Sequence, residues 1–139
     1  MPAKKYLIVS RSFYPANSPR ANRTTELAKE LCRQGHQVTV LTPHHPDQNE
    51  IAKEYGMMLV DLGQDRLPVI PTQFRGRSSL PLRALSRGLW IALDYPSIEL
   101  AFRVPRVLRR IEHHDVLISI AAPHAVHWGV ARAFGRSEK

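Results

Sequence analysis

Four short apolar runs divide the chain, and polar or proline-bearing segments separate them. The runs lie at residues 6–10, 37–42, 57–62 and 115–120, and Leu, Ile and Val are frequent in each. An apolar run of this length with little polar alternation is typical of a strand that is buried on both faces of a parallel sheet. We therefore predict four strands.

The first helix is expected directly after the first strand and its loop. Ser18 has the side chain of an N-cap, and Pro19 suits the first helical position, where a missing N–H costs nothing. Apolar residues at 27, 28 and 31 share one face, and Gly35 is a usual stop signal.

Helical spacing recurs between and after the other strands. It predicts a short helix at 49–55, two helices at 80–94 and 97–111 with a kink or boundary at Pro105, and a last helix at 125–134. Strands that alternate with helices predict an α/β fold, a Rossmann-like parallel sheet with flanking helices. The whole chain, residues 1–139, fits one domain, and because another strand would ordinarily follow its last helix, we expect the sheet to be truncated.

Charge and cysteine content indicate which kind of partner and which compartment suit the protein. The 139 residues include 20 Lys and Arg against 12 Asp and Glu, a formal net charge of +8 that favours an anionic partner. The single cysteine, Cys32, excludes an internal disulfide and favours a reducing compartment. No apolar run is long enough for a signal-peptide core or a membrane span, so we expect a cytoplasmic protein that can be peripheral at the inner face of the membrane.

The segment 7–42 resembles the N-terminal signature of family 4 glycosyltransferases. The elements that carry the resemblance are the strand, the Phe-Tyr-Pro loop, the helix with Glu-Leu-Ala-Lys-Glu-Leu, and Gly-His-x-Val-Thr-Val-Leu-Thr. The later Asp-Val-Leu-Ile-Ser strand with its Pro-His exit loop also fits this signature. In two respects the chain differs: Ser18-Pro19 stands where many members have Gly-Gly, and no two glutamates have the spacing of the donor-site pair.

This resemblance implies the GT-B architecture, in which two Rossmann-like domains face each other. The N-terminal domain mostly holds the acceptor, the C-terminal domain holds the nucleotide sugar, and no metal ion or other cofactor is required. We therefore expect an acceptor-binding domain whose C-terminal donor domain is absent from this chain. The parent enzyme would transfer a sugar from a nucleotide-sugar donor to a cell-surface polysaccharide or glycolipid, and this chain alone is expected to be inactive.

Ligands of parallel sheets bind beyond the carboxyl ends of the strands, which here lead into loops at 11–19, 43–47 and 121–124. Glycosyl transfer must stabilise negative charge on the leaving diphosphate, and helix N-termini and arginines do this well. In the first loop and the helix after it, the residues predicted to bind substrate are Ser12, Asn17, Ser18 and Arg20. The alternative is that the loop residues make only the turn and the cap while the arginine faces solvent.

His124 follows the fourth strand and is the predicted catalytic residue. An imidazole there could orient an acceptor hydroxyl or the transferred sugar, or accept a proton. The alternative is a histidine of a surface loop. His127 lies three residues on, but His-x-x-His without a third ligand is a weak zinc signal, so no metal site is expected. At the opposite end of the sheet, His36 and Asp115 are expected to be structural.

The stretch between Arg75 and Glu112 contains eight arginines and three acidic residues. Leucines at 82, 85 and 89 share one helical face, and arginines lie on another beside Trp90. Membrane-surface helices often have this pattern, so the stretch could bind an anionic membrane that carries a lipid-linked acceptor. The alternative is an amphipathic helix that packs on the sheet.

Other classes fit less well. A dinucleotide-binding dehydrogenase needs a glycine-rich first loop, and this loop has no glycine. The common signatures of nucleic-acid-binding folds are missing, so nucleic acid is not expected as a partner. The serious alternative is a standalone, non-catalytic binding domain or a remnant of such an enzyme.

Overall fold

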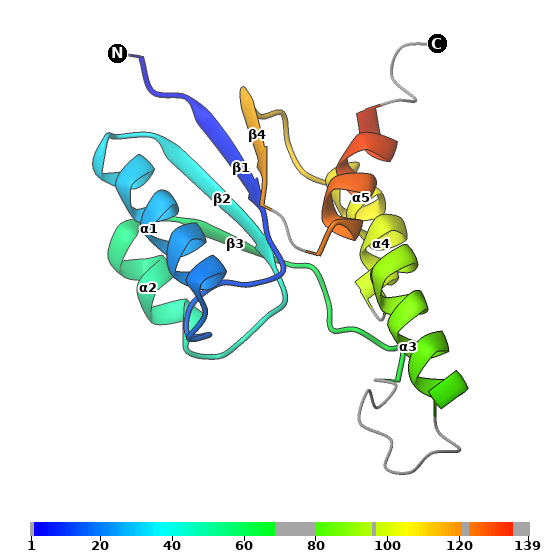
Figure 1. Ribbon diagram of the computed structural model, residues 1–139. Coiled ribbons are helices and arrows are strands. Elements are labelled where there is room, and N and C mark those ends of the chain that lie inside the picture. Colours follow the sequence, from blue (N-terminus) through cyan, green and yellow to red (C-terminus); the bar gives the residue numbers. More distant parts are fainter. Residues whose placement is uncertain (1, 69–79, 96, 121–122, 135–139) are drawn as a thin grey trace.

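The computed structural model describes residues 2–68, 80–95, 97–120 and 123–134, and it contains one parallel sheet (Figure 1). The strand order is β3-β2-β1-β4, and helices flank the sheet, so the predicted α/β, Rossmann-like fold class is confirmed. The strands are β1 (Lys5–Val9), β2 (Gln37–Thr42), β3 (Met58–Asp61) and β4 (Val116–Ser119). Their bounds agree with the four apolar runs to within one residue at each end.

β1 is a central strand of the sheet, because it pairs with β2 on one side and with β4 on the other. Ile8 stands opposite Val40 in β2 and opposite Ile118 in β4. All of these pairs are parallel, so the carboxyl ends of the strands meet at one edge of the sheet.

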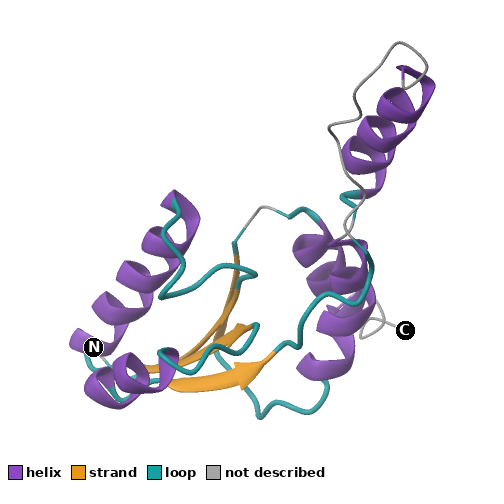
Figure 2. Ribbon diagram, turned by 90° about the horizontal axis from the view of Figure 1, so that it is seen from below, coloured by secondary structure: helices purple, strands orange, loops and turns teal. Residues whose placement is uncertain are grey.

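Helices lie on both sides of the sheet (Figure 2). The helices α1 (Pro19–Arg33) and α2 (Gln48–Tyr55) lie on one side, and α4 (Leu100–Leu108) and α5 (Ala125–Phe134) lie on the other. A 3₁₀ turn (Ser97–Glu99) precedes α4, and α3 (Leu80–Leu93) extends beyond α4. The predicted N-cap of α1 is confirmed, since Ser18 Oγ accepts a hydrogen bond of 3.1 Å from the N–H of Ala21.

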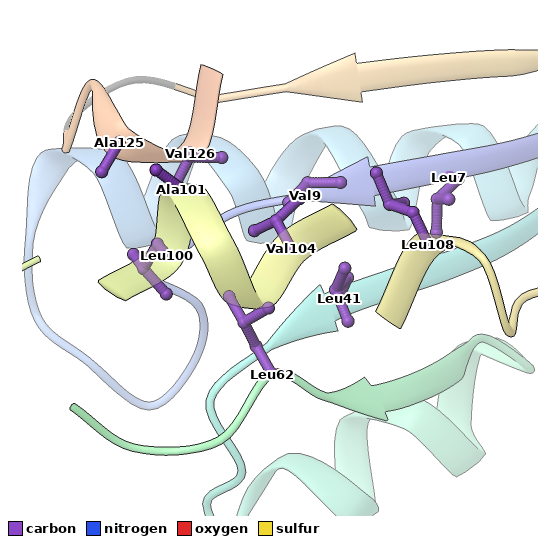
Figure 3. Packing of buried hydrophobic residues seen from close by; sticks show 10 residues of the cluster. All are labelled: Leu7, Val9, Leu41, Leu62, Leu100, Ala101, Val104, Leu108, Ala125 and Val126. Carbon is purple, nitrogen blue, oxygen red and sulfur yellow. The ribbon is translucent and has the colours of Figure 1, made fainter. Parts of the chain in front are cut away.

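Successive residues of β1 enter different halves of the core, as the pleat of a strand requires. Ile8 packs with the apolar residues of α1 and α2. Leu7 and Val9 pack with α4 and α5, and Figure 3 shows Val9 and Val104 within this second cluster. In this cluster α4 and α5 approach each other so closely that a Cβ at Gly129 of α5 would lie 2.7 Å from Val104 Cβ of α4.

The region predicted as one helix at 97–111 is shorter and more divided in the structure. Its first residues form the 3₁₀ turn, and α4 ends at Leu108. Pro105 lies inside α4 and is buried, and the helix continues past it to Leu108. Pro105 has no backbone N–H to donate, but its apolar ring lies on the buried face of α4.

Candidate functional site

The order of the strands defines a topological switch point at the carboxyl edge, between β1 and β4. The chain leaves β1 toward α1 on one face of the sheet and leaves β4 toward α5 on the other face. At such a topological switch point the two exit loops diverge, and ligands of open parallel sheets bind in the space between them. The candidate site is therefore formed by the segment after β1 and the segment that enters α5.

Hydroxyl groups fix the segment after β1 to the first turns of α1. Ser10 is buried, and its Oγ lies 3.1 Å from Thr24 Oγ1. The same Ser10 hydroxyl donates to the carbonyl of Ser12 at 2.9 Å and accepts from the N–H of Ser12 at 3.3 Å. Thr25 Oγ1 accepts from the N–H of Tyr14 at 3.2 Å. The loop is therefore held at the beginning of α1 by side chains of the helix itself.

The four residues predicted to bind substrate all lie in or next to this loop, and they differ in their surroundings. Ser12 is half-buried and joins the hydroxyl network through its backbone. The Ser18 hydroxyl caps α1, and the Ser18 carbonyl accepts from the N–H of Asn22 at 3.0 Å. Asn17 and Arg20 are exposed beside the helix N-terminus. The first turn of α1 contains no acidic side chain, so its positive end keeps its affinity for negative charge.

Arg11 connects this loop to the segment after β3, because its guanidinium forms an ion pair with Asp65. Asp61, the last residue of β3, accepts from the N–H of Gly63 at 2.7 Å and from the N–H of His44 at 3.0 Å. The loop after β2 is thereby bound to the end of β3. The residues that follow β2, His44 among them, form a polar turn.

Thr42, at the end of β2, is a buried polar residue that the sequence argument did not select. It is 2% exposed, and its Oγ1 has no hydrogen-bond partner among the described residues. The N–H of Ser10 donates to the carbonyl of Leu41 at 3.0 Å, so Thr42 lies next to the loop of the candidate site. A hydroxyl residue at the last position of a strand, at the carboxyl edge of the sheet, is the signal that could have identified it.

On the other side of the switch point, Ser119 at the end of β4 lies against α5. Its Oγ is 2.6 Å from His127 Nδ1. His124, the predicted catalytic residue, is exposed at the entrance to α5, where its carbonyl accepts from the N–H of Trp128 at 3.1 Å. Residues 121–122 of its loop lie outside the described residues. His127, which the sequence paired with His124, therefore has a partner of its own in Ser119.

The amino end of the sheet also has a cavity, of about 700 Å³, whose lining includes Val107, Ile111 and His114. Its size alone would favour it as a ligand site, but it lies opposite the edge at which parallel sheets bind ligands. The two expected structural residues are found at this end. His36 Nδ1 accepts from the N–H of Lys4 at 3.3 Å, and the Asp115 carboxylate accepts from the N–H of Lys5 at 2.8 Å. We therefore assign the candidate site to the switch point.

In the described parts of the chain, no three His, Cys, Asp or Glu residues are grouped so that they could hold a metal ion. None of the helices there is both long enough and apolar enough to cross a membrane. Comparison of the sequence and the structure with protein-family models, curated proteins and solved structures gives no significant match.

Proposed function

We propose that this chain is the acceptor-binding domain of a GT-B glycosyltransferase. The parent enzyme moves a sugar from a nucleotide-sugar donor to a hydroxyl of a polysaccharide or glycolipid acceptor. The observation that best supports this proposal is the switch point between β1 and β4, beside which the polar pairs Ser10–Thr24 and Ser119–His127 lie. The resemblance of residues 7–42 to family 4 glycosyltransferases supports the same reading.

Each predicted site residue has a role in this proposal. Asn17 and Arg20 are exposed at the uncompensated positive end of α1, where they can bind acceptor oxygens and stabilise charge on the leaving diphosphate. Ser12 and Ser18 shape the loop, and the Ser18 cap fixes where the helix begins. His124 orients the acceptor hydroxyl or accepts its proton. In this proposal the donor is a co-substrate held by the second Rossmann-like domain of such an enzyme, and the chemistry needs no metal ion.

The proposal is tested by presenting the chain to a glycan array and then titrating the best-bound glycan into labelled protein, with NMR detection. We expect the backbone signals of Ser12, Asn17, Arg20 and His124 to shift. Arg20→Ala and His124→Ala should each weaken binding about tenfold, the effect of one hydrogen bond to a charged or polar group. Arg106→Ala, which removes an exposed arginine from the last turn of α4, is the matched control. Shifts confined to the cavity at the amino end of the sheet would contradict the assignment.

A second candidate function is a standalone, non-catalytic binding domain. The observation that favours it is the position of β4 at an edge of the described sheet, because an open edge can pair with a partner chain. The two candidates are separated by sequencing the coding DNA beyond the codon for Lys139. An in-frame second Rossmann-like half with the spaced glutamates supports the glycosyltransferase, and a stop codon supports the standalone domain.

A further inference from the structure

The helix α3 differs from the other helices in how much apolar surface it exposes. Within Leu80–Leu93, which is described in full, only Ser86 is buried. Leu85 and Trp90 are each 60% exposed and Ile91 is 70% exposed. Leu80, Leu82 and Leu93 are also exposed large apolar side chains. A helix that is apolar around most of its circumference is normally buried. The composition of α3 is therefore that of a buried helix, although the helix is exposed to solvent.

The position of α3 explains this exposure. Figure 1 places it beyond α4, and Figure 2 shows it standing away from the sheet and from the other helices. The alternative expected from the sequence for this stretch was an amphipathic helix that packs on the sheet. In the structure α4 is such a helix, and α3 is not. Leu100, Val104 and Leu108 of α4 are buried in the core. Of the stretch between Arg75 and Glu112, residues 75–79 and 96 lie outside the described residues.

The charges of α3 have one sign. Arg83 and Arg87 are four residues apart and therefore share a face of the helix, and no Asp or Glu lies within Leu80–Leu93. With 14 residues, the helix is about 21 Å long at about 1.5 Å per residue, which is too short to cross a bilayer but enough to lie along its surface.

We infer that α3 binds the surface of an anionic lipid bilayer. Its leucines, Ile91 and Trp90 enter the boundary between headgroups and acyl chains, while Arg87 contacts lipid phosphates. A second copy of the chain is the competing occupant, but two chains of net charge +8 repel each other. Two copies of an α3 without acidic side chains also offer no ion pair across their contact. An anionic bilayer instead attracts both the helix and the whole chain. The inference does not depend on the proposed function.

Vesicle flotation tests it with the full chain. We expect binding to vesicles of phosphatidylcholine with phosphatidylglycerol and no binding to phosphatidylcholine alone. Raising the salt concentration should release the chain, because salt screens the attraction between the arginines and the lipid charge. Absence of binding to the anionic vesicles at low salt would overturn the inference.

Substitutions on α3 locate the contact. Leu85→Gln and Ile91→Gln should each weaken binding about tenfold, because each removes an apolar side chain from the lipid. Met58→Gln is the matched control, since Met58 is 64% exposed but lies on β3. Arg87→Gln should weaken binding about fivefold, and Arg109→Gln, which changes the net charge equally at an exposed position, should have little effect. Equal losses in the α3 variants and in their controls would overturn the assignment to α3.

Tryptophan fluorescence gives a second readout that does not depend on the solubility of the α3 variants. The chain has two tryptophans, so Trp128→Phe leaves Trp90 as the sole reporter. We expect a blue shift of Trp90 emission on addition of anionic vesicles. An unshifted spectrum would show that α3 does not enter the lipid. If the chain instead self-associates in sedimentation, does not bind vesicles, and loses its self-association in the Leu85→Gln variant, the exposed surface of α3 contacts a second copy of the chain.

Discussion

The carboxylate of Asp94 accepts a hydrogen bond of 2.9 Å from the backbone N–H of Ala125, 31 residues further along the chain. Asp94 follows α3 and has a φ of +52°, in the left-handed region that few residues other than glycine adopt. Ala125 is the first residue of α5 and is fully buried. The acidic side chain therefore caps the positive end of α5 from a distant turn, and α5 in turn leads away from the candidate site.

Removing this cap should destabilise the protein. Asp94→Ala leaves the buried N–H of Ala125 without its acceptor and should lower the free energy of unfolding by about 1–2 kcal/mol. Asp94→Asn keeps an oxygen acceptor and tolerates the positive φ, so it should retain most of the stability. Urea denaturation of the three proteins measures the difference. Equal losses in both variants would show that the charge, and not the hydrogen bond, is what matters.

The close contact of α4 and α5 predicts an intolerance of side chains at Gly129. A Cβ there would lie 2.7 Å from Val104 Cβ and 2.8 Å from the carbonyl oxygen of Leu100. Gly129→Ala should therefore destabilise the protein by about 1–3 kcal/mol through overpacking, although alanine is the better helix former. Gly88→Ala on α3 is the matched control, because nothing lies within 4 Å of its Cβ position. That variant should be stabilised by up to about 1 kcal/mol, and thermal unfolding of both variants checks the contrast.

Two of the buried threonines at the candidate site, Thr42 and Thr24, should respond differently to removal of the hydroxyl. Thr42 Oγ1 has no partner among the described residues, so Thr42→Val should leave stability unchanged or raise it by about 1 kcal/mol. Thr24 Oγ1 donates to the Arg20 carbonyl at 2.9 Å, and Thr24→Val should cost about 1 kcal/mol. Denaturant titration decides between these outcomes. A destabilised Thr42→Val would mean that this hydroxyl does bond within the folded protein.

Cys32 should react slowly in the folded protein. Burial raises the pKa of its thiol, so less of the reactive thiolate is present at a given pH. Alkylation by iodoacetamide should be slower in the native chain than in guanidinium, and its midpoint should lie at higher pH. Since the folded pKa is the higher one, this thiol's contribution to stability is complete below the unfolded pKa and is lost as the pH rises through the folded pKa. Identical pH midpoints in the native and unfolded chain would contradict the burial of the thiol.

Local patterns made much of the fold predictable from sequence. Each strand is a short, mainly apolar run. β1 and β2 are largely buried as predicted, whereas the edge strands differ: β4 is half-buried, and β3 is exposed at both of its ends. Ser18 and Pro19 mark the beginning of α1 by chemistry that acts within one turn. Pro105 shows the limit of such rules. A helix whose proline lies on the apolar face can keep it, because burial of the ring offsets the lost hydrogen bond.

The candidate site was predictable only as a set of loops. In a parallel sheet all strands end at the same edge. The prediction of a parallel sheet was therefore enough to locate the segments around Ser12 and His124 at that edge. The pairs that build the site join different elements: Arg11 pairs with Asp65, 54 residues further along the chain, and Ser119 of β4 contacts His127 of α5, eight residues on. No spacing rule connects such residues, because only the folded backbone brings them together. The exposure of α3 could not be predicted either, because a helix that packs on the sheet can have the same pattern of leucines and arginines.

The central place of β1 has a consequence for the rate of folding. Its pairing with β2 joins residues such as Ile8 and Val40 across one connecting helix, whereas its pairing with β4 joins Ile8 to Ile118. Closing the longer loop costs more chain entropy, so β4 is expected to dock after β1, β2 and β3 have assembled. During that interval one edge of β1 is unpaired and open to other chains. Dilution should therefore improve the yield of refolding more than it changes the stability of the folded protein.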